Sequence, residues 1–191
     1  MFKLIPPILF IILSSNFIFA SELSDEAKWH KDLKTIIENQ QFTKIGEATF
    51  SILFWDLYKS KLLTTSGNYP INDDNDKLIY EINYLKDISS ADLLKRTIEQ
   101  WQHIGVEAES YHAYLPLLQQ IWPDINKGDT LSLVFDKQSS AFYYNQELIG
   151  IIDIPQFGQL FIDIWLAKNT SQPDLRKELL GKIAEQEVNN G

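Results

Sequence analysis

The chain has no cysteine among its 191 residues, and it has three histidines and a formal charge of −9. The missing cysteines exclude a disulfide framework, a cysteine-ligated zinc and a thiol nucleophile. His30, His103 and His112 form no metal-binding pair, and no glycine-rich phosphate loop is present, so we expect neither a metal nor another cofactor. The acidic balance argues against nucleic acid or an anionic membrane surface as a partner.

The first 20 residues have the layout of a secretory signal peptide. Lys3 supplies the positive start, and an apolar run leads to a small residue, Ala20. A membrane anchor is the alternative, but Pro6-Pro7 interrupts the run, which is about half the ~20 residues that a spanning helix needs. We expect cleavage after Ala20, a periplasmic or secreted protein, and no stable membrane insertion after cleavage. Residues 21–41 then form an N-terminal arm or short helix, and residues 42–191 form one domain.

Lys44 to Leu63 is rich in β-forming residues. Apolar side chains stand at both odd and even positions, which would point to opposite faces of a strand. Because the stretch is long for one strand, we predict a long bent strand or two strands joined by a bulge. Asp56 lies among the aromatic residues. One interpretation makes Asp56 a general base or a ligand anchor with a raised pKa. The favoured interpretation places Asp56 at a bulge or strand end, where its carboxylate is hydrogen-bonded and exposed to water, because unpaired buried carboxylates are costly.

The remaining elements follow from alternation and helical spacing. "KLIYEINYLK" and "GDTLSLVFD" alternate like half-buried strands, and "AFYYNQELIGIID" predicts a hairpin that turns at residues 145–147. Ser89 starts a helix that ends at Gly105, and Pro116 kinks or restarts the helix that follows. "PQFGQLFIDIWLA" and "SQPDLRKELLG" are two more helices. Grouped strands favour an α+β fold, with helices packed on an antiparallel sheet.

An ordered set of segments resembles the chalcone isomerase-like family, specifically its exported bacterial branch. The set covers roughly Phe42 to Gly181 and consists of "GEATFSILFWDLYKSKL", "YLKDISSADLLKRTIEQW", "GDTLSLVF", the hairpin that leads into "FGQLFIDIWL", and "TSQPDLRKELLG". The resemblance implies an open-faced β-sandwich, a large antiparallel sheet with a layer of helices and a cleft between them. The resemblance also implies two possible functions. Plant members of the family close a flavanone ring, whereas relatives with the same fold bind fatty acids or have no known chemistry.

The catalytic residues that the resemblance implies for plant members are missing. The long strand has no Arg between Ile45 and Tyr58, and the matching position falls near Thr49. The first helix lacks the expected Tyr and Asn, and Ile164 stands where a hydroxyl would be expected. The loss of one such preorganised partner typically costs several kcal/mol of transition-state stabilisation. No catalytic residue is therefore carried over.

The sequence therefore favours a non-catalytic, exported protein that binds a small apolar or amphipathic ligand, such as a fatty acid, in the cleft between sheet and helices. The tryptophans can line a pocket or simply fill the core, and Arg96 can hold a carboxylate or be solvated. One alternative is an isomerase or lyase that uses Asp56 with Tyr58, and another is a protein-interaction module without a ligand, whose partner the sequence does not name. The candidate ligand contacts are Thr49, Trp55, Asp56, Tyr58, Arg96, Trp101, Ile164 and Trp165.

Overall fold

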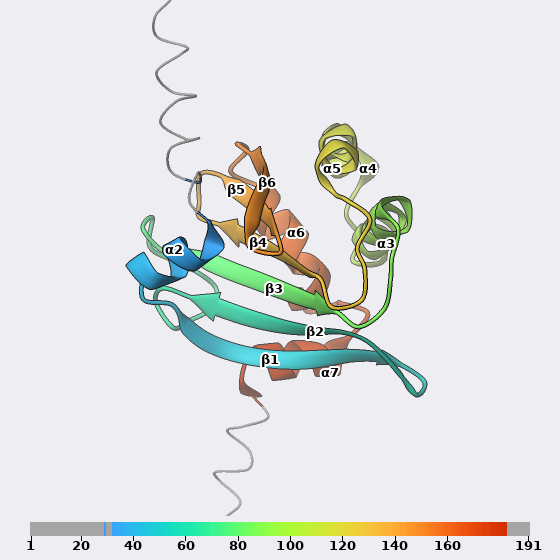
Figure 1. The fold of residues 1–191 in the computed structure, drawn as a ribbon, viewed down its shortest axis with the longest axis horizontal. Helices are drawn as coiled ribbons and strands as arrows, with labels where there is room; N and C mark the ends of the chain where they lie inside the picture. The colour runs from blue at the N-terminus through green and yellow to red at the C-terminus, as the bar shows by residue number, and fades with distance from the viewer. Residues whose placement is uncertain (1–28, 30–31, 183–191) are drawn as a thin grey trace, which may run out of the picture.

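The computed structural model describes Trp29 and residues 32–182, which form an α+β fold around one antiparallel sheet (Figure 1). Six strands lie side by side in chain order, and every neighbouring pair is antiparallel. This arrangement confirms the predicted antiparallel sheet with a layer of helices. The strands are β1 (Thr43–Ile52), β2 (Trp55–Thr64), β3 (Leu78–Tyr84), β4 (Thr130–Phe135), β5 (Ser140–Tyr144) and β6 (Glu147–Ile152).

The helices lie mainly on one face of the sheet (Figure 1). α3 (Ser90–His103), α4 (Ala108–Tyr111), a short 3-10 helix (His112–Tyr114) and α5 (Leu115–Ile121) connect β3 to β4. α6 (Phe157–Leu166) and α7 (Pro173–Leu179) follow β6, and α2 (Leu33–Asn39) lies on the opposite face. The predicted restart at Pro116 is confirmed, because this proline stands in the first turn of α5.

Two apolar clusters hold these layers together. The larger one lies between the sheet and helices α3 to α7, where Trp101, Phe142 and Phe157 have no exposed surface. The smaller one lies on the opposite face, where Trp29 and Leu33 pack against Ile79, Val134, Ala141 and Tyr143. The Trp29 indole also donates to Ser139 Oγ at 3.0 Å. The described part of the predicted N-terminal arm is therefore packed on the sheet.

The prediction for Lys44 to Leu63 is wrong in one respect. The stretch is an antiparallel hairpin rather than one long strand, because Leu53 and Phe54 form a two-residue turn between β1 and β2. Leu53 has a φ of 56°, a left-handed conformation that glycine or asparagine normally supplies in such turns. Without either residue, the sequence carried no recognisable turn signal. Bulges do occur, as register shifts between Lys44 and Gly46 and between Phe50 and Ser51, but they lie within the pairing of β1 with β2 and do not join the two strands as predicted.

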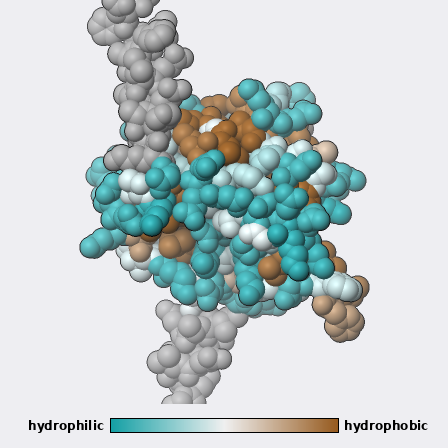
Figure 2. Space-filling view, in the orientation of Figure 1, coloured by the Kyte–Doolittle hydropathy of each residue, from teal (hydrophilic) through white to brown (hydrophobic). Residues whose placement is uncertain are grey.

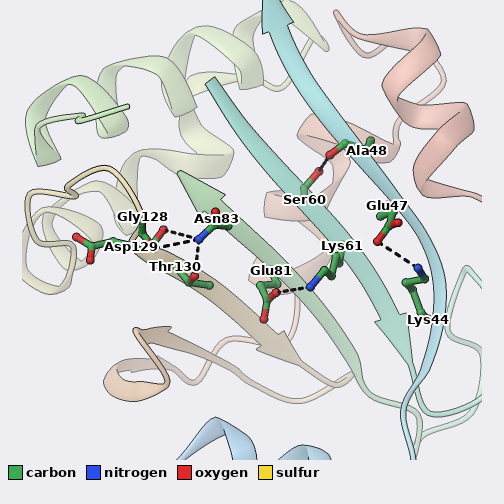
Figure 3. A network of polar contacts seen from close by, with 10 residues as sticks. All are labelled: Lys44, Glu47, Ala48, Ser60, Lys61, Glu81, Asn83, Gly128, Asp129 and Thr130. Carbon is green, nitrogen blue, oxygen red and sulfur yellow. Dashed lines mark hydrogen bonds and ion pairs between the residues drawn. The ribbon is translucent and has the colours of Figure 1, made fainter. Parts of the chain in front are cut away.

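Outside the cluster around Trp29 and α2, the face of β1 to β3 that points away from α3 to α7 is polar. Figure 3 shows the ion pair between Lys61 and Glu81, whose N···O distance is 3.4 Å, with Lys44 and Glu47 nearby on β1. At the end of β3, Asn83 Nδ2 donates to the carbonyl of Gly128, in the turn before β4, at 3.0 Å (Figure 3). Successive side chains of these strands therefore point alternately to the polar face and to the face that packs on the helices.

Local signals fix the helices that flank the sheet. The Ser89 side chain accepts a hydrogen bond from the Asp92 backbone N–H at the start of α3, which confirms the predicted cap.

α7 packs very closely on β1, since a Cβ built on Gly46 would lie 2.2 Å from the carbonyl oxygen of Glu178. Glycine is required at this position because no side chain fits.

The expected signal peptide lies outside the described residues. Within Trp29 and residues 32–182, no helix has both the length and the hydropathy needed to cross a membrane.

Candidate functional site

A cavity of about 480 Å³ lies between the sheet and the helical layer. Its walls come from β1 to β4 on one side and from α3 and α6 on the other. Cavities of this size suit small organic ligands, which typically occupy roughly 300–1,000 Å³. Most of the lining is apolar, and these side chains are Phe50, Ile52, Leu57, Ile82, Ile88, Leu93, Leu131, Phe161, Ile164 and Trp165.

The interior of the cavity contains two tyrosines, Tyr58 on β2 and Tyr84 on β3. The Trp165 indole N–H donates to the Tyr58 hydroxyl at 2.8 Å, so this hydroxyl keeps its own hydrogen to donate. Burial raises the pKa of the Tyr58 phenol to about 12, although the bond from Trp165 opposes the shift. Burial also raises the pKa of Tyr84. Both phenols are therefore neutral at physiological pH and can hydrogen-bond an uncharged polar group.

Charged side chains stand where the cavity opens to solvent. Lys86, Asp87 and Arg96 belong to the lining and are exposed. Arg96 Nη1 pairs with Glu99 Oε2 at 2.9 Å while 71% of its side chain stays exposed, so the pair is a weak surface interaction. Asp87 Oδ1 accepts the backbone N–H of Lys127 at 2.7 Å. Two cations and one anion around an apolar chamber suit a ligand with an apolar body and an anionic end.

The structure brings four of the eight candidate contacts to this cavity, namely Tyr58, Arg96, Ile164 and Trp165. Trp165 packs against Tyr80 with the rings tilted by 45° and their centroids 4.6 Å apart, and it forms part of the wall. Arg96 reaches the opening and not the interior. Whether these side chains contact a ligand stays a prediction.

The structure places the other four candidates, Thr49, Trp55, Asp56 and Trp101, outside the cavity lining. Thr49 is exposed and pairs with Lys59 in the register of β1 and β2, on the polar face of the sheet. Trp101 is a core residue, with no exposed surface and its indole bonded to the carbonyl of Leu160 at 3.0 Å. Trp55 and Asp56 lie at the β1–β2 turn, where Asp56 Oδ1 accepts the Ser51 hydroxyl at 2.6 Å and its side chain is exposed.

Several lining residues were missed although the sequence carried a signal for them. Leu93, Thr97 and Gln100 stand at i, i+4 and i+7 on α3, one face of a helix. Phe161 precedes Trp165 by one turn of α6, and Tyr84 shares its strand face with Ile82. The periodicity therefore identified the inward face, but it did not separate a filled core from a hollow one.

A second hollow of about 470 Å³ lies beside the loop that carries Tyr69 and Pro70. Its lining includes the cations Lys44, Arg176 and Lys182. Two of these are engaged, because Lys44 pairs with Glu47 at 3.1 Å and Arg176 Nε donates to the carbonyl of Leu166 at 2.7 Å. Within the described residues, no group of three or more His, Asp or Glu side chains is arranged to hold a metal ion.

Comparison with known proteins identifies the family. The sequence profile described as chalcone isomerase-like matches residues 26–181. The chain belongs to the chalcone isomerase-like family. An uncharacterized protein of Haemophilus influenzae is 25% identical over 138 residues, which cover 72% of this chain and 67% of that protein.

The fold of this chalcone isomerase-like chain is similar to that of a solved plant protein. The crystal structure of a fatty-acid binding protein of Arabidopsis thaliana matches with a TM-score of 0.56 and 9% sequence identity. The match covers 75% of this chain and 89% of the plant chain. At this identity the likeness concerns the fold, an open sheet with a helical layer.

Proposed function

We propose that this chalcone isomerase-like protein binds a small amphipathic molecule in the cavity between the sheet and α3 and α6, without catalysing a reaction on it. The observation that carries the proposal is the cavity itself, about 480 Å³ in volume and walled mainly by aliphatic and aromatic side chains. A hollow with such walls favours an apolar ligand body, because binding removes apolar surface from water. The fatty-acid binding protein with a similar fold adds support.

The charges suggest how such a ligand lies. The interior offers neutral phenols, whereas Lys86 and Arg96 stand at the opening. An ionised carboxylate in the interior would lack a cation, which is costly in an apolar environment. The apolar tail therefore extends inward, past Trp165 and Phe161, and the anionic end stays near the cations. A single-chain fatty acid or a similar monoanionic amphiphile has this chemistry.

A cavity-filling substitution tests the proposal. Leu93→Trp adds an indole to the α3 wall of the cavity, whereas Leu117→Trp makes the same change on α5, where the side chain is 39% exposed and outside the lining. A fluorescent fatty acid should bind the wild-type protein and Leu117→Trp with equal affinity. Leu93→Trp should bind at least roughly tenfold more weakly, since loss of a well-buried apolar contact is worth more than a factor of ten. Equal binding by all three proteins would place the ligand elsewhere, and no binding by any of them would refute the proposal.

The enzymatic alternative used Asp56 with Tyr58, and the arrangement of these residues does not favour it. Asp56 is exposed and bonded to Ser51, whereas Tyr58 faces the cavity with a phenol too weakly acidic to ionise near neutral pH. Among the described lining residues, β1 to β4 contribute no cation to hold a developing oxyanion. We expect no acceleration of chalcone ring closure in an absorbance assay. Saturable turnover that disappears in Arg96→Ala would make Arg96 catalytic and overturn the non-catalytic proposal.

Export is part of the proposal and rests on the sequence alone. The charged start, the interrupted apolar run and Ala20 suggest processing before residue 21 and a periplasmic or secreted location. N-terminal sequencing of the protein recovered from its host tests this, with Ser21 expected as the first residue. An intact Met1 on a membrane-bound form would show that the segment is an anchor.

A further inference from the structure

The β1–β2 hairpin ends in four consecutive exposed apolar side chains, of which only Ile52 also lines the cavity. Ile52, Leu53, Phe54 and Trp55 are 52%, 87%, 97% and 63% exposed. We call these four residues the hairpin tip. Figure 1 shows the hairpin extending beyond the neighbouring strands, and Figure 2 shows an apolar protrusion at the same place, at the lower right of a largely hydrophilic face. Consecutive apolar side chains on a protruding turn usually serve an interaction.

The backbone conformation of the hairpin tip is one that these apolar residues do not favour. Leu53 adopts a φ of 56°, where glycine, asparagine or aspartate would be accommodated more easily. A bulky residue in this conformation is a local outlier, and outliers of this kind concentrate at functional sites. The turn is nevertheless closed by the pairing of Ile52 with Trp55, so the strands remain paired up to the last residue before it. Because β1 is the edge strand of the sheet, its outer backbone groups need water or lipid headgroups as partners, so only the side chains of the tip enter the apolar layer.

We propose that the hairpin tip inserts into the surface of a phospholipid bilayer, from which the cavity takes up its amphipathic ligand. Two facts favour lipid over a protein partner. First, the tip consists of four residues on a convex turn, whereas a standard protein interface uses roughly 20–30 residues a side. Second, Trp and Phe beside a lysine form the side-chain combination that membrane–water interfaces favour, and Lys86 Nζ lies 4.8 Å from the centre of the Trp55 ring.

The tip is continuous with the cavity. Ile52 belongs to both, and Lys86 lines the cavity opening while it covers the Trp55 ring. A tip seated among lipid headgroups therefore brings the opening to the membrane surface. Asp56 follows the tip directly, and its charged carboxylate limits insertion to the turn. The net charge of −9 favours a zwitterionic surface over an anionic one. The uptake part of this inference rests on the proposed ligand-binding function, whereas insertion itself does not.

The absence of cysteine makes a site-specific test direct. Phe54→Cys and, as a control, Leu117→Cys each introduce one thiol into the full chain, and each is labelled with an environment-sensitive fluorophore. Leu117 is also an exposed apolar residue, but it lies on α5. With phosphatidylcholine vesicles, the label at position 54 should shift to the blue and be quenched by lipid-borne quenchers, and the label at position 117 should do neither. Because all variants share the same terminal residues, only the position of the label differs.

Several outcomes would overturn the inference. If both labels stay in water, or if both enter lipid, the hairpin tip is not the inserting element. If the label at position 54 stays in water with vesicles but is protected by a second protein, the tip is a protein-docking element. In a matched functional test, Leu53→Ser with Phe54→Ser should slow transfer of a fluorescent fatty acid from vesicles roughly tenfold or more, because two large apolar side chains no longer leave water. Affinity for the same fatty acid without vesicles should be unchanged, and an unchanged transfer rate would contradict the uptake role.

The two hypotheses fail separately. If the protein binds no fatty acid in solution, the proposed function is wrong, and the fluorophore at position 54 still decides whether the tip inserts. If the protein binds the fatty acid but the label stays in water, the inference about the tip is wrong and the proposed function stands.

Discussion

Trp165 is the side chain through which packing and the cavity can be tested together. Its ring packs against Tyr80 and Phe161, with centroids 4.6 and 5.4 Å away, and its indole N–H donates to Tyr58. A fully buried Trp→Ala change costs about 3–5 kcal/mol. Because one side of the Trp165 ring already faces the cavity, we expect Trp165→Ala to lower the free energy of unfolding by about 3 kcal/mol, the low end of that range.

Trp165→Phe separates the two contributions. It keeps most of the ring contacts and removes the donor to Tyr58, so the expected loss is about 1 kcal/mol, the usual net value of one hydrogen bond. Urea melts followed by far-ultraviolet circular dichroism measure both variants without relying on tryptophan fluorescence. A loss below about 0.5 kcal/mol for Trp165→Ala, the size of an ordinary surface substitution, would show that the ring is not packed on Tyr80. Equal losses of unfolding free energy for Trp165→Ala and Trp165→Phe would assign the whole effect to the hydrogen bond with Tyr58.

Three further predictions concern parts of the fold outside the cavity. Gly46→Ala should destabilise the protein by about 1–3 kcal/mol in denaturant melts, because the new Cβ would meet the Glu178 carbonyl; a neutral result would mean that α7 does not pack on β1. Trp29→Ala should cost about 3–5 kcal/mol if the arm belongs to the core, whereas a small loss would make it dispensable. The Tyr144 hydroxyl, with Asn145, lowers the pKa of Asp129 to about 2, so the associated stability is present above about pH 4 and is lost as the pH falls towards 2. Tyr144→Phe should raise that pKa in a carboxyl NMR titration and lose less stability over this window; an unchanged pKa would contradict the assignment.

The sequence predicted those elements whose ends carry specific chemistry. Ser89 announced the start of α3, and the turn after β5 was recognisable because Asn145 tolerates the positive φ that it adopts. The turn at Leu53 and Phe54 was missed because it contains no residue that favours such a conformation. A weaker signal was available. Glu47, Thr49 and Ser51 alternate with Ala48, Phe50 and Ile52, so alternation could have assigned Thr49 to the polar face.

The candidate site was predictable only in part because a cavity is a property of packing. Tyr58, Ile164 and Trp165 stand on inward faces that periodicity identifies, yet Trp101, with equally strong periodicity, fills the core. Whether an inward side chain meets another side chain or a void depends on how α3 and α6 are spaced from the sheet. That spacing is set by contacts between distant segments, such as the bond from the Trp101 indole to the carbonyl of Leu160. Local sequence does not encode these contacts.

Native mass spectrometry of the protein as it is isolated from its host tests the central claim most directly. The account predicts that wild-type protein and Leu117→Trp carry a small amphipathic molecule with an apolar chain and an acidic end, and that Leu93→Trp carries little or none. Identification of the released molecule by tandem mass spectrometry would then assign the ligand class. A wild-type protein that carries no such molecule and takes up no added fatty acid, or a Leu93→Trp variant that carries the same molecule at full occupancy, would contradict a binding function for the cavity.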